Sequence, residues 1–167
     1  MHECKLYIYK MRIISLILLA SVLALTLVSC GRNVDCYSLA TEFGEAFGTV
    51  GTVFSPRVAE TDSGYVSQTF FSVMYSEENI HSEDYAIWLC SRADASGEAA
   101  FFLAFSEWDA ISIEGMLLSR IDLIGSVFGK GEGSPANGAF VMRSGKLVVM
   151  CATGDNERAR TVVKMIT

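Results

Sequence analysis

The chain has 167 residues, of which 51% are hydrophobic, and its 13 basic and 19 acidic side chains give a net charge of −6. A chain of this length has enough residues for one ordinary domain around one core. Its acidic balance argues against non-specific binding to nucleic acid or to anionic lipid headgroups, which requires a positive surface.

The first thirty residues have the pattern of a secretory signal. Lys10 and Arg12 precede an apolar run over residues 13–28, and the small Ser29 and then Cys30 follow it. The run of about 16 residues is shorter than the ~20 that a spanning helix needs. It has the length of the apolar core of a cleaved signal. The alternative is an uncleaved signal anchor.

The ending Leu27-Val28-Ser29-Cys30 resembles the lipobox of bacterial lipoproteins. This resemblance implies a signal peptide over residues 1–29, cleavage between Ser29 and Cys30, and acylation of Cys30 as the first mature residue. Residues 30–35 would then form a lipidated tether. Two acyl chains hold a protein stably on a bilayer, so we expect a lipid anchor in the cell membrane, with the domain on the extracytoplasmic side. Whether translation starts at Met1 or Met11 stays open.

Cleavage before Cys30 would leave 138 residues with 10 basic and 18 acidic side chains, a net charge of −8, and a single domain over residues 36–167. Beside Cys30 the mature chain keeps Cys36, Cys90 and Cys151. An odd number of thiols is not typical of a disulfide framework. Cys90 and Cys151 could form a disulfide if their strands are neighbours, but we favour two small buried apolar residues.

The predicted elements begin with a helix over residues 35–47, which Asp35 caps and two glycines end. Residues 49–64 are expected to form a loop. Residues 65–75 are rich in strand formers, but their apolar spacing also suits a helix, so both remain open. Continuous apolar runs predict strands over 84–91 and 99–105, joined as a hairpin.

The second half begins with the longest predicted helix, residues 108–124. Ser144-Gly145 predicts a hairpin turn between strands 139–143 and 146–152. Asp155 should cap a last helix over 156–166. The order is α, the ambiguous segment, ββ, α, ββ, α. We therefore predict an α+β fold of two layers, with three helices mostly on one side of a four-stranded, mainly antiparallel sheet.

Two segments invite a catalytic or ligand-binding interpretation. The glycine-rich residues 129–138 contain Lys130, but a phosphate loop follows a strand and opens a helix, whereas this one does the reverse. His81 lies among acids and is the one histidine left after cleavage. A metal site there would need oxygens that converge in space, and a solvated acidic loop is the favoured interpretation. No cofactor or metal is predicted.

Aromatic side chains could line a ligand pocket or form the core of a small domain, and the core is favoured. They are Phe70, Phe71, Trp88, Phe101, Phe102, Phe105 and Trp108.

The whole pattern resembles a family of small uncharacterised lipoproteins of Gram-positive bacteria that carry a domain of unknown function. The resemblance rests on the order of elements from Asp84 to Ile166, with Arg120 in the long helix and Pro135 in the loop after it. It implies no activity and no catalytic residues. We therefore expect a non-enzymatic, membrane-anchored module at the cell envelope, which binds an envelope protein or another envelope component or serves as an accessory subunit. The alternatives are a small-ligand binder and a minor hydrolase that uses His81.

Overall fold

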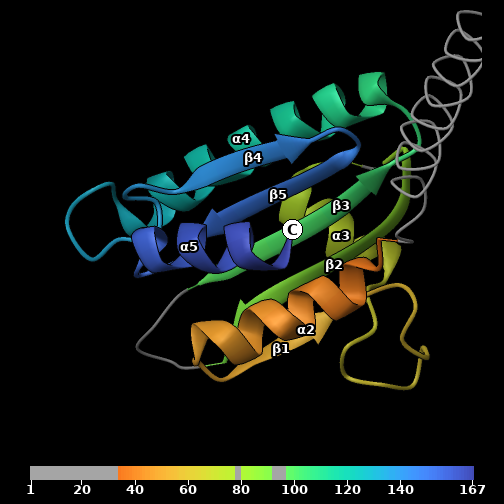
Figure 1. Ribbon diagram of the computed structural model, residues 1–167, viewed down its shortest axis with the longest axis horizontal. Helices are drawn as coiled ribbons and strands as arrows, with labels where there is room; N and C mark the ends of the chain where they lie inside the picture. Colours follow the sequence, from red (N-terminus) through yellow and green to blue (C-terminus); the bar gives the residue numbers. More distant parts are fainter. Residues whose placement is uncertain (1–33, 78–79, 92–96) are drawn as a thin grey trace, which may run out of the picture. The chain divides into compact units, whose positions relative to one another are not determined.

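The computed structural model describes residues 34–77, 80–91 and 97–167, and from Asp35 onward the chain forms one compact unit. The fold is α+β, with five antiparallel strands in the order β1-β2-β3-β5-β4 (Figure 1). The strands are β1 Gly51–Phe54, β2 Ser82–Cys90, β3 Glu98–Ala104, β4 Phe140–Ser144 and β5 Leu147–Ala152. The helices are α2 Cys36–Phe47, α3 Gln68–Tyr75, α4 Glu107–Phe128 and α5 Asn156–Ile166.

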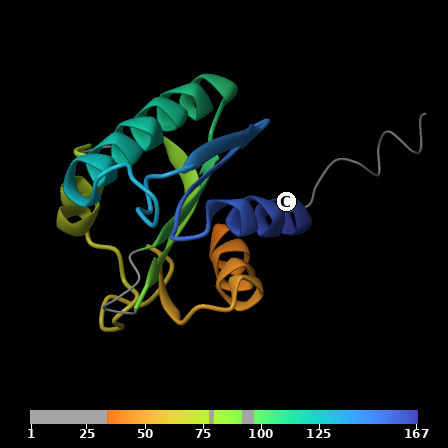
Figure 2. The same cartoon turned by 90° about the vertical axis from the view of Figure 1, so that its left-hand side faces the viewer.

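The sheet carries helices on both faces, so the expected two-layer arrangement is wrong. Helices α2 and α5 lie on one face and α3 and α4 on the other (Figure 2). The physical reason was visible in the strands. Apart from Glu98 at the start of β3, both β3 and β5 are continuous apolar runs and almost wholly buried. A strand covered on both faces loses the alternation of apolar and polar residues. A sheet with one face exposed to solvent would have kept this alternation.

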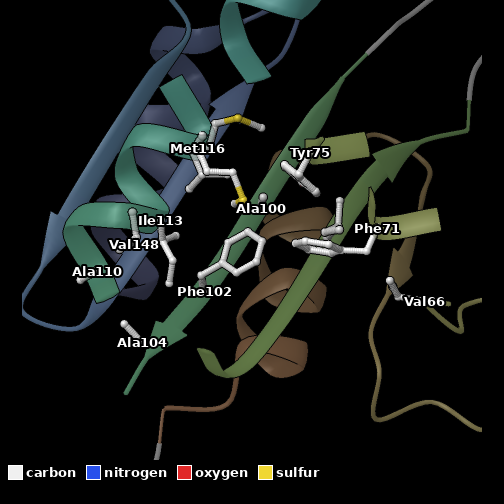
Figure 3. Close-up of a cluster of buried hydrophobic side chains, with 13 residues drawn as sticks. Val66, Phe71, Tyr75, Ala100, Phe102, Ala104, Ala110, Ile113, Met116 and Val148 are labelled. Carbon is white, nitrogen blue, oxygen red and sulfur yellow. The ribbon is translucent and has the colours of Figure 1, made fainter. Parts of the chain in front are cut away.

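Two neighbouring residues of β3 show the division into two cores, because successive side chains of a strand point to opposite faces. Phe101 contacts the ring of Phe43 from α2, at 5.9 Å between centroids. Phe102 contacts Phe71 and Tyr75 from α3, at 6.2 and 5.8 Å. Figure 3 shows the second core, where these rings meet the side chains of α4.

Strand β1 corrects the loop that we expected over residues 49–64. It pairs with β2 at the sheet edge, from Gly51↔Cys90 to Phe54↔Ile87. Thr52, Val53 and Phe54 are strand formers, and this was the available signal. Gly51 is required there because a Cβ at that position would overlap the indole of Trp88.

The ambiguous residues 65–75 contain helix α3. Ser67 caps it by accepting a hydrogen bond from the backbone N–H of Phe70 at 3.1 Å. Phe71 and Tyr75, four residues apart, are the pair that it buries. A helix here satisfies its own backbone groups, whereas a strand would have needed a free sheet edge beside it. The other predicted helices and strands are present, with ends within a few residues of those expected.

Candidate functional site

The start of the domain is held by a buried carboxylate. Asp84, on β2, accepts a hydrogen bond from the backbone N–H of Cys36 at 2.9 Å, and the Cys36 thiol lies 3.7 Å from the Asp84 carbonyl oxygen. Arg57 pairs with the buried Asp84 at 2.9 Å and with the half-exposed Asp35 at 3.5 Å. The chain is therefore fixed to the sheet from its first helical residue onward.

A second buried charge pair lies on the opposite face of the sheet. Arg120 of α4 donates from Nη2 to Glu98 Oε2 at 2.7 Å and from Nε at 3.0 Å. Glu98 Oε1 accepts from the hydroxyl of Tyr75 at 2.8 Å. Burial, and then the charge of Glu98, raise the pKa of Tyr75 well above its ordinary value. Each hydrogen-bonding group here has a partner inside the fold, so the arrangement is suited to holding α3 and α4 on the sheet.

His81 does not acquire the partners of a catalytic base. Its ring is 79% exposed and its Nδ1 lies 3.9 Å from Asp109 Oδ1. Asp109 in turn accepts from the hydroxyl of Ser106, so the carboxylate lies between histidine and serine. A nucleophilic serine needs the histidine between itself and the acid. In this cluster the acid lies between the serine and the histidine, so His81 is not placed to take the proton of Ser106.

A hollow of about 160 Å³ adjoins His81. It is lined by Glu77, Ile80, His81, Asp109, Ser112, Ile113 and Met116. The nearby hydroxyl of Ser112 donates to the Trp108 carbonyl at 3.3 Å. Among the residues that the structure describes, no group of three His, Cys, Asp or Glu side chains gathers as a metal site. Part of the acidic run beside His81, residues 78–79, lies outside the described residues.

The glycine-rich loop follows α4 and leads to β4, as the sequence indicated. Lys130 pairs with Asp122 at 3.0 Å. Gly129 and Gly133 have φ values of +78° and +80°, which other residues rarely adopt. Asn156 at the start of α5 donates to the carbonyls of Pro135 and Asn137, which fixes the loop to the C-terminal helix.

A cleft of about 200 Å³ opens between α2, α5 and the end of the sheet where β3 begins. Its lining residues are Phe47, Thr49, Trp88, Cys90, Gly97, Thr153, Gly154, Asp155 and Arg158. The guanidinium of Arg158 lies over the Phe47 ring, 5.5 Å from its centroid. The cleft has apolar walls, the cation of Arg158 and the carboxylate of Asp155, which accepts from the backbone N–H of Arg158. Apolar walls with a cation suit a small molecule that joins an apolar body to an anionic group. No sequence signal singled out this cleft, because α2, β2 and α5 supply its walls from distant parts of the chain.

The aromatic residues divide between core and surface. Phe71, Trp88, Phe101 and Phe102 are buried, and Phe70 is partly buried against the core, as expected. Phe105 and Trp108 are exposed, so the assignment of these two to the core is wrong. Both flank the start of α4, where a strand ends and the chain turns away from the sheet.

The possible Cys90–Cys151 disulfide is not formed. Strand β3 separates the two strands that carry these residues, and both thiols are free. Crossing two strand spacings places the Cα atoms about 9 Å apart or more, beyond the ~7 Å limit for a disulfide. Cys151 is buried, as is Cys36. Ser29 and Cys30 lie outside the described residues.

Alkylation of the native protein should label Cys90 well before Cys36 and Cys151. Cys90 lines the open cleft, whereas burial raises the pKa of both other thiols and keeps them protonated. A protonated, buried thiol reacts only when the fold opens. Peptide mapping after a short pulse of iodoacetamide measures the order, and unfolding in urea should make all three react alike. Equal labelling in the native state would contradict the burial of Cys36 and Cys151.

None of the helices in the described part of the chain is long and apolar enough to cross a membrane. No protein-family model matches the chain, and neither a curated protein nor a solved structure matches it significantly.

Proposed function

We propose that the protein is a lipid-anchored extracytoplasmic domain that acts at the cell envelope as a binding or accessory module. The observation that carries this proposal is Leu27-Val28-Ser29-Cys30 at the end of an apolar run. The compact domain begins at Asp35, only five residues after Cys30. A domain so close to an acylated cysteine stays beside the bilayer and meets its partners there.

The surroundings of His81 favour a module over a hydrolase. An exposed imidazole loosely paired with one carboxylate, with the serine hydroxyl on the far side of that carboxylate, has no means of activating a nucleophile. The two buried ionic clusters are used within the fold, where they fix α2 and α4 to the sheet. The surface is thus left for binding, and its net acidity favours envelope proteins over nucleic acid.

Mass spectrometry of the membrane-extracted protein tests the anchor. Trypsin should release an acylated peptide from Cys30 to Arg32. Cys30→Ala should abolish acylation and cleavage, because the sulfur that receives the diacylglyceryl group is gone. Cys4→Ala is the matched control, since Cys4 would be discarded with the signal, and it should leave acylation unchanged. An unmodified Cys30, or a mature N-terminus at another residue, would reject the proposal.

The cleft favours a second candidate, a small-ligand-binding lipoprotein. Its size suits a single small molecule, and Arg158 would meet an anionic group while Trp88 and Phe47 contact an apolar body. A thermal-shift screen of small aromatic and aliphatic carboxylates should then raise the melting temperature. Arg158→Gln should remove the shift, while Arg143→Gln, on β4, should keep it. A screen without a hit would eliminate this candidate.

A further inference from the structure

The start of α4 exposes large apolar side chains that the fold does not use. Trp108 is 81% exposed, Phe105 56% and Ile111 48%. Trp108 and Ile111 are three residues apart on the helix, so they lie on the same side of it, and Phe105 directly precedes the capping Ser106. We call these three residues the Trp108 patch. Exposed apolar groups that gather in this way mark an interaction surface more often than scattered ones do.

The Trp108 patch lies at the end of the sheet where the domain starts. The start of β2 pairs with the end of β3, through Ser82↔Ala104 and Asp84↔Leu103. Asp84 accepts a hydrogen bond from the backbone N–H of Cys36, the first residue of α2. Phe105 is the first residue after β3. In Figure 1, α2 and α4 both begin at the right-hand end. The first residue of the domain and the Trp108 patch therefore share one end of the molecule.

The length of the preceding chain limits how far this end can move from a bilayer. Cys30 is five residues before Asp35, and five extended residues span at most about 18 Å. This step rests on the proposed anchor at Cys30. An acyl group in the membrane then keeps the domain's starting end, with its exposed tryptophan, within about two helix diameters of the headgroups.

The charges around the patch decide which kind of contact is possible. Glu83, Glu107 and Asp109 are nearby acids, and Lys146 is occupied by Glu83 at 3.7 Å. Attraction to anionic lipid is therefore not the driving force. Tryptophan, by contrast, favours the boundary between water and lipid, because its ring is apolar and its N–H is polar. We propose that the Trp108 patch inserts into the headgroup region of the bilayer and turns the starting end of the domain toward the membrane.

One consequence concerns the cleft beside Trp88. It lies where β2 and β5 end and β3 begins, which is the opposite end of the sheet. Contact of the Trp108 patch with lipid directs the cleft away from the bilayer. A ligand or partner in the extracytoplasmic space then reaches the cleft without passing the membrane surface.

Tryptophan fluorescence tests the contact directly, since the protein has two tryptophans and Trp88 is buried. The full protein is purified from whichever cell fraction contains it and is mixed with, or reconstituted into, phosphatidylcholine vesicles. Two kinds of vesicle are compared, one with ordinary acyl chains and one with acyl chains that are brominated near the headgroup. We expect the Trp108 emission to shift to shorter wavelength and to be quenched by the brominated lipid. In the Trp108→Phe variant the emission comes from Trp88, and this emission should be the same with and without vesicles.

A matched variant moves the reporter to the other end of α4. Phe128 is 54% exposed at the last helical residue, about 30 Å from Trp108 along the helix. Trp108→Phe/Phe128→Trp should show no quenching. Equal quenching of both reporters, or none for Trp108, would overturn the proposal. So would quenching abolished by high salt, or the same spectral shift on concentrating the protein without vesicles, which would indicate a second copy as the occupant.

Mass spectrometry of the same sample separates this proposal from the anchor itself. Acylated Cys30 without quenching of Trp108 retains the anchor and rejects the membrane contact. Unmodified Cys30 with quenching rejects the lipid anchor and retains the contact. Unmodified Cys30 without quenching rejects both.

Discussion

Arg120→Met should lower the free energy of unfolding by about 3–5 kcal/mol, because it would leave the buried Glu98 carboxylate without its cation. Glu98 is almost fully buried and accepts three hydrogen bonds from Arg120 and one from Tyr75. Urea denaturation monitored by circular dichroism measures the change. The comparable variant Arg143→Met breaks a partly exposed pair with Glu114 and should cost less than about 1 kcal/mol.

A double variant shows whether the loss comes from the uncompensated charge. In Arg120→Met with Glu98→Gln the amide carries no charge and its oxygen can still accept from Tyr75. We expect this double variant to recover much of the stability that Arg120→Met loses, so that the two substitutions are not additive. If Arg120→Met costs no more than Arg143→Met, the Glu98–Arg120 pair does not stabilise the fold.

Phe101→Ala and Phe102→Ala should each cost about 3–5 kcal/mol, which is the range for deleting a buried ring. The two residues are neighbours on β3 and point to opposite faces of the sheet, and both are fully buried. Equal losses therefore require a core on each face. In a two-layer domain with one wet face, one of the two substitutions would be nearly neutral.

Phe105→Ala is the control on the same stretch of chain. Phe105 follows β3 directly but is exposed, so its removal should change the stability by no more than about 0.5 kcal/mol. Urea denaturation measures all three variants. A small loss at either Phe101 or Phe102 would contradict the arrangement of helices on both faces.

Local patterns predicted most individual elements, because each depends on residues close in sequence. Asp35 and Asp155 cap the helices α2 and α5 with their side chains, as predicted, and a cap needs only the next few backbone N–H groups. The predicted hairpin between β4 and β5 is present, but its turn residues are Gly145 and Lys146, one position later than expected, because Ser144 still pairs with Leu147 in the sheet. Strand β1 was not predicted, because four residues are too few to show a periodic pattern.

The candidate sites also differ in whether their residues are close together in the sequence. Cys30 was singled out by contiguous residues and remains a prediction of the sequence. The pairing of Arg120 with Glu98, the cleft that Arg158 borders, and the position of Asp84 under Cys36 join residues from 22 to 112 positions apart. Such distances leave no periodic signal in a single chain.

The sequence by itself determined the acidic character and the order of helices and antiparallel hairpins, since these depend on composition and short-range periodicity, and it predicts the secretory signal. Only the tertiary structure decided that the helices cover both faces of the sheet and that Cys90 and Cys151 are separated by a strand. It also decided that Trp108 is left in solvent while Trp88 is buried. The physical reason is that burial depends on which surfaces meet, and an apolar side chain looks the same in the sequence whether another element covers it or not.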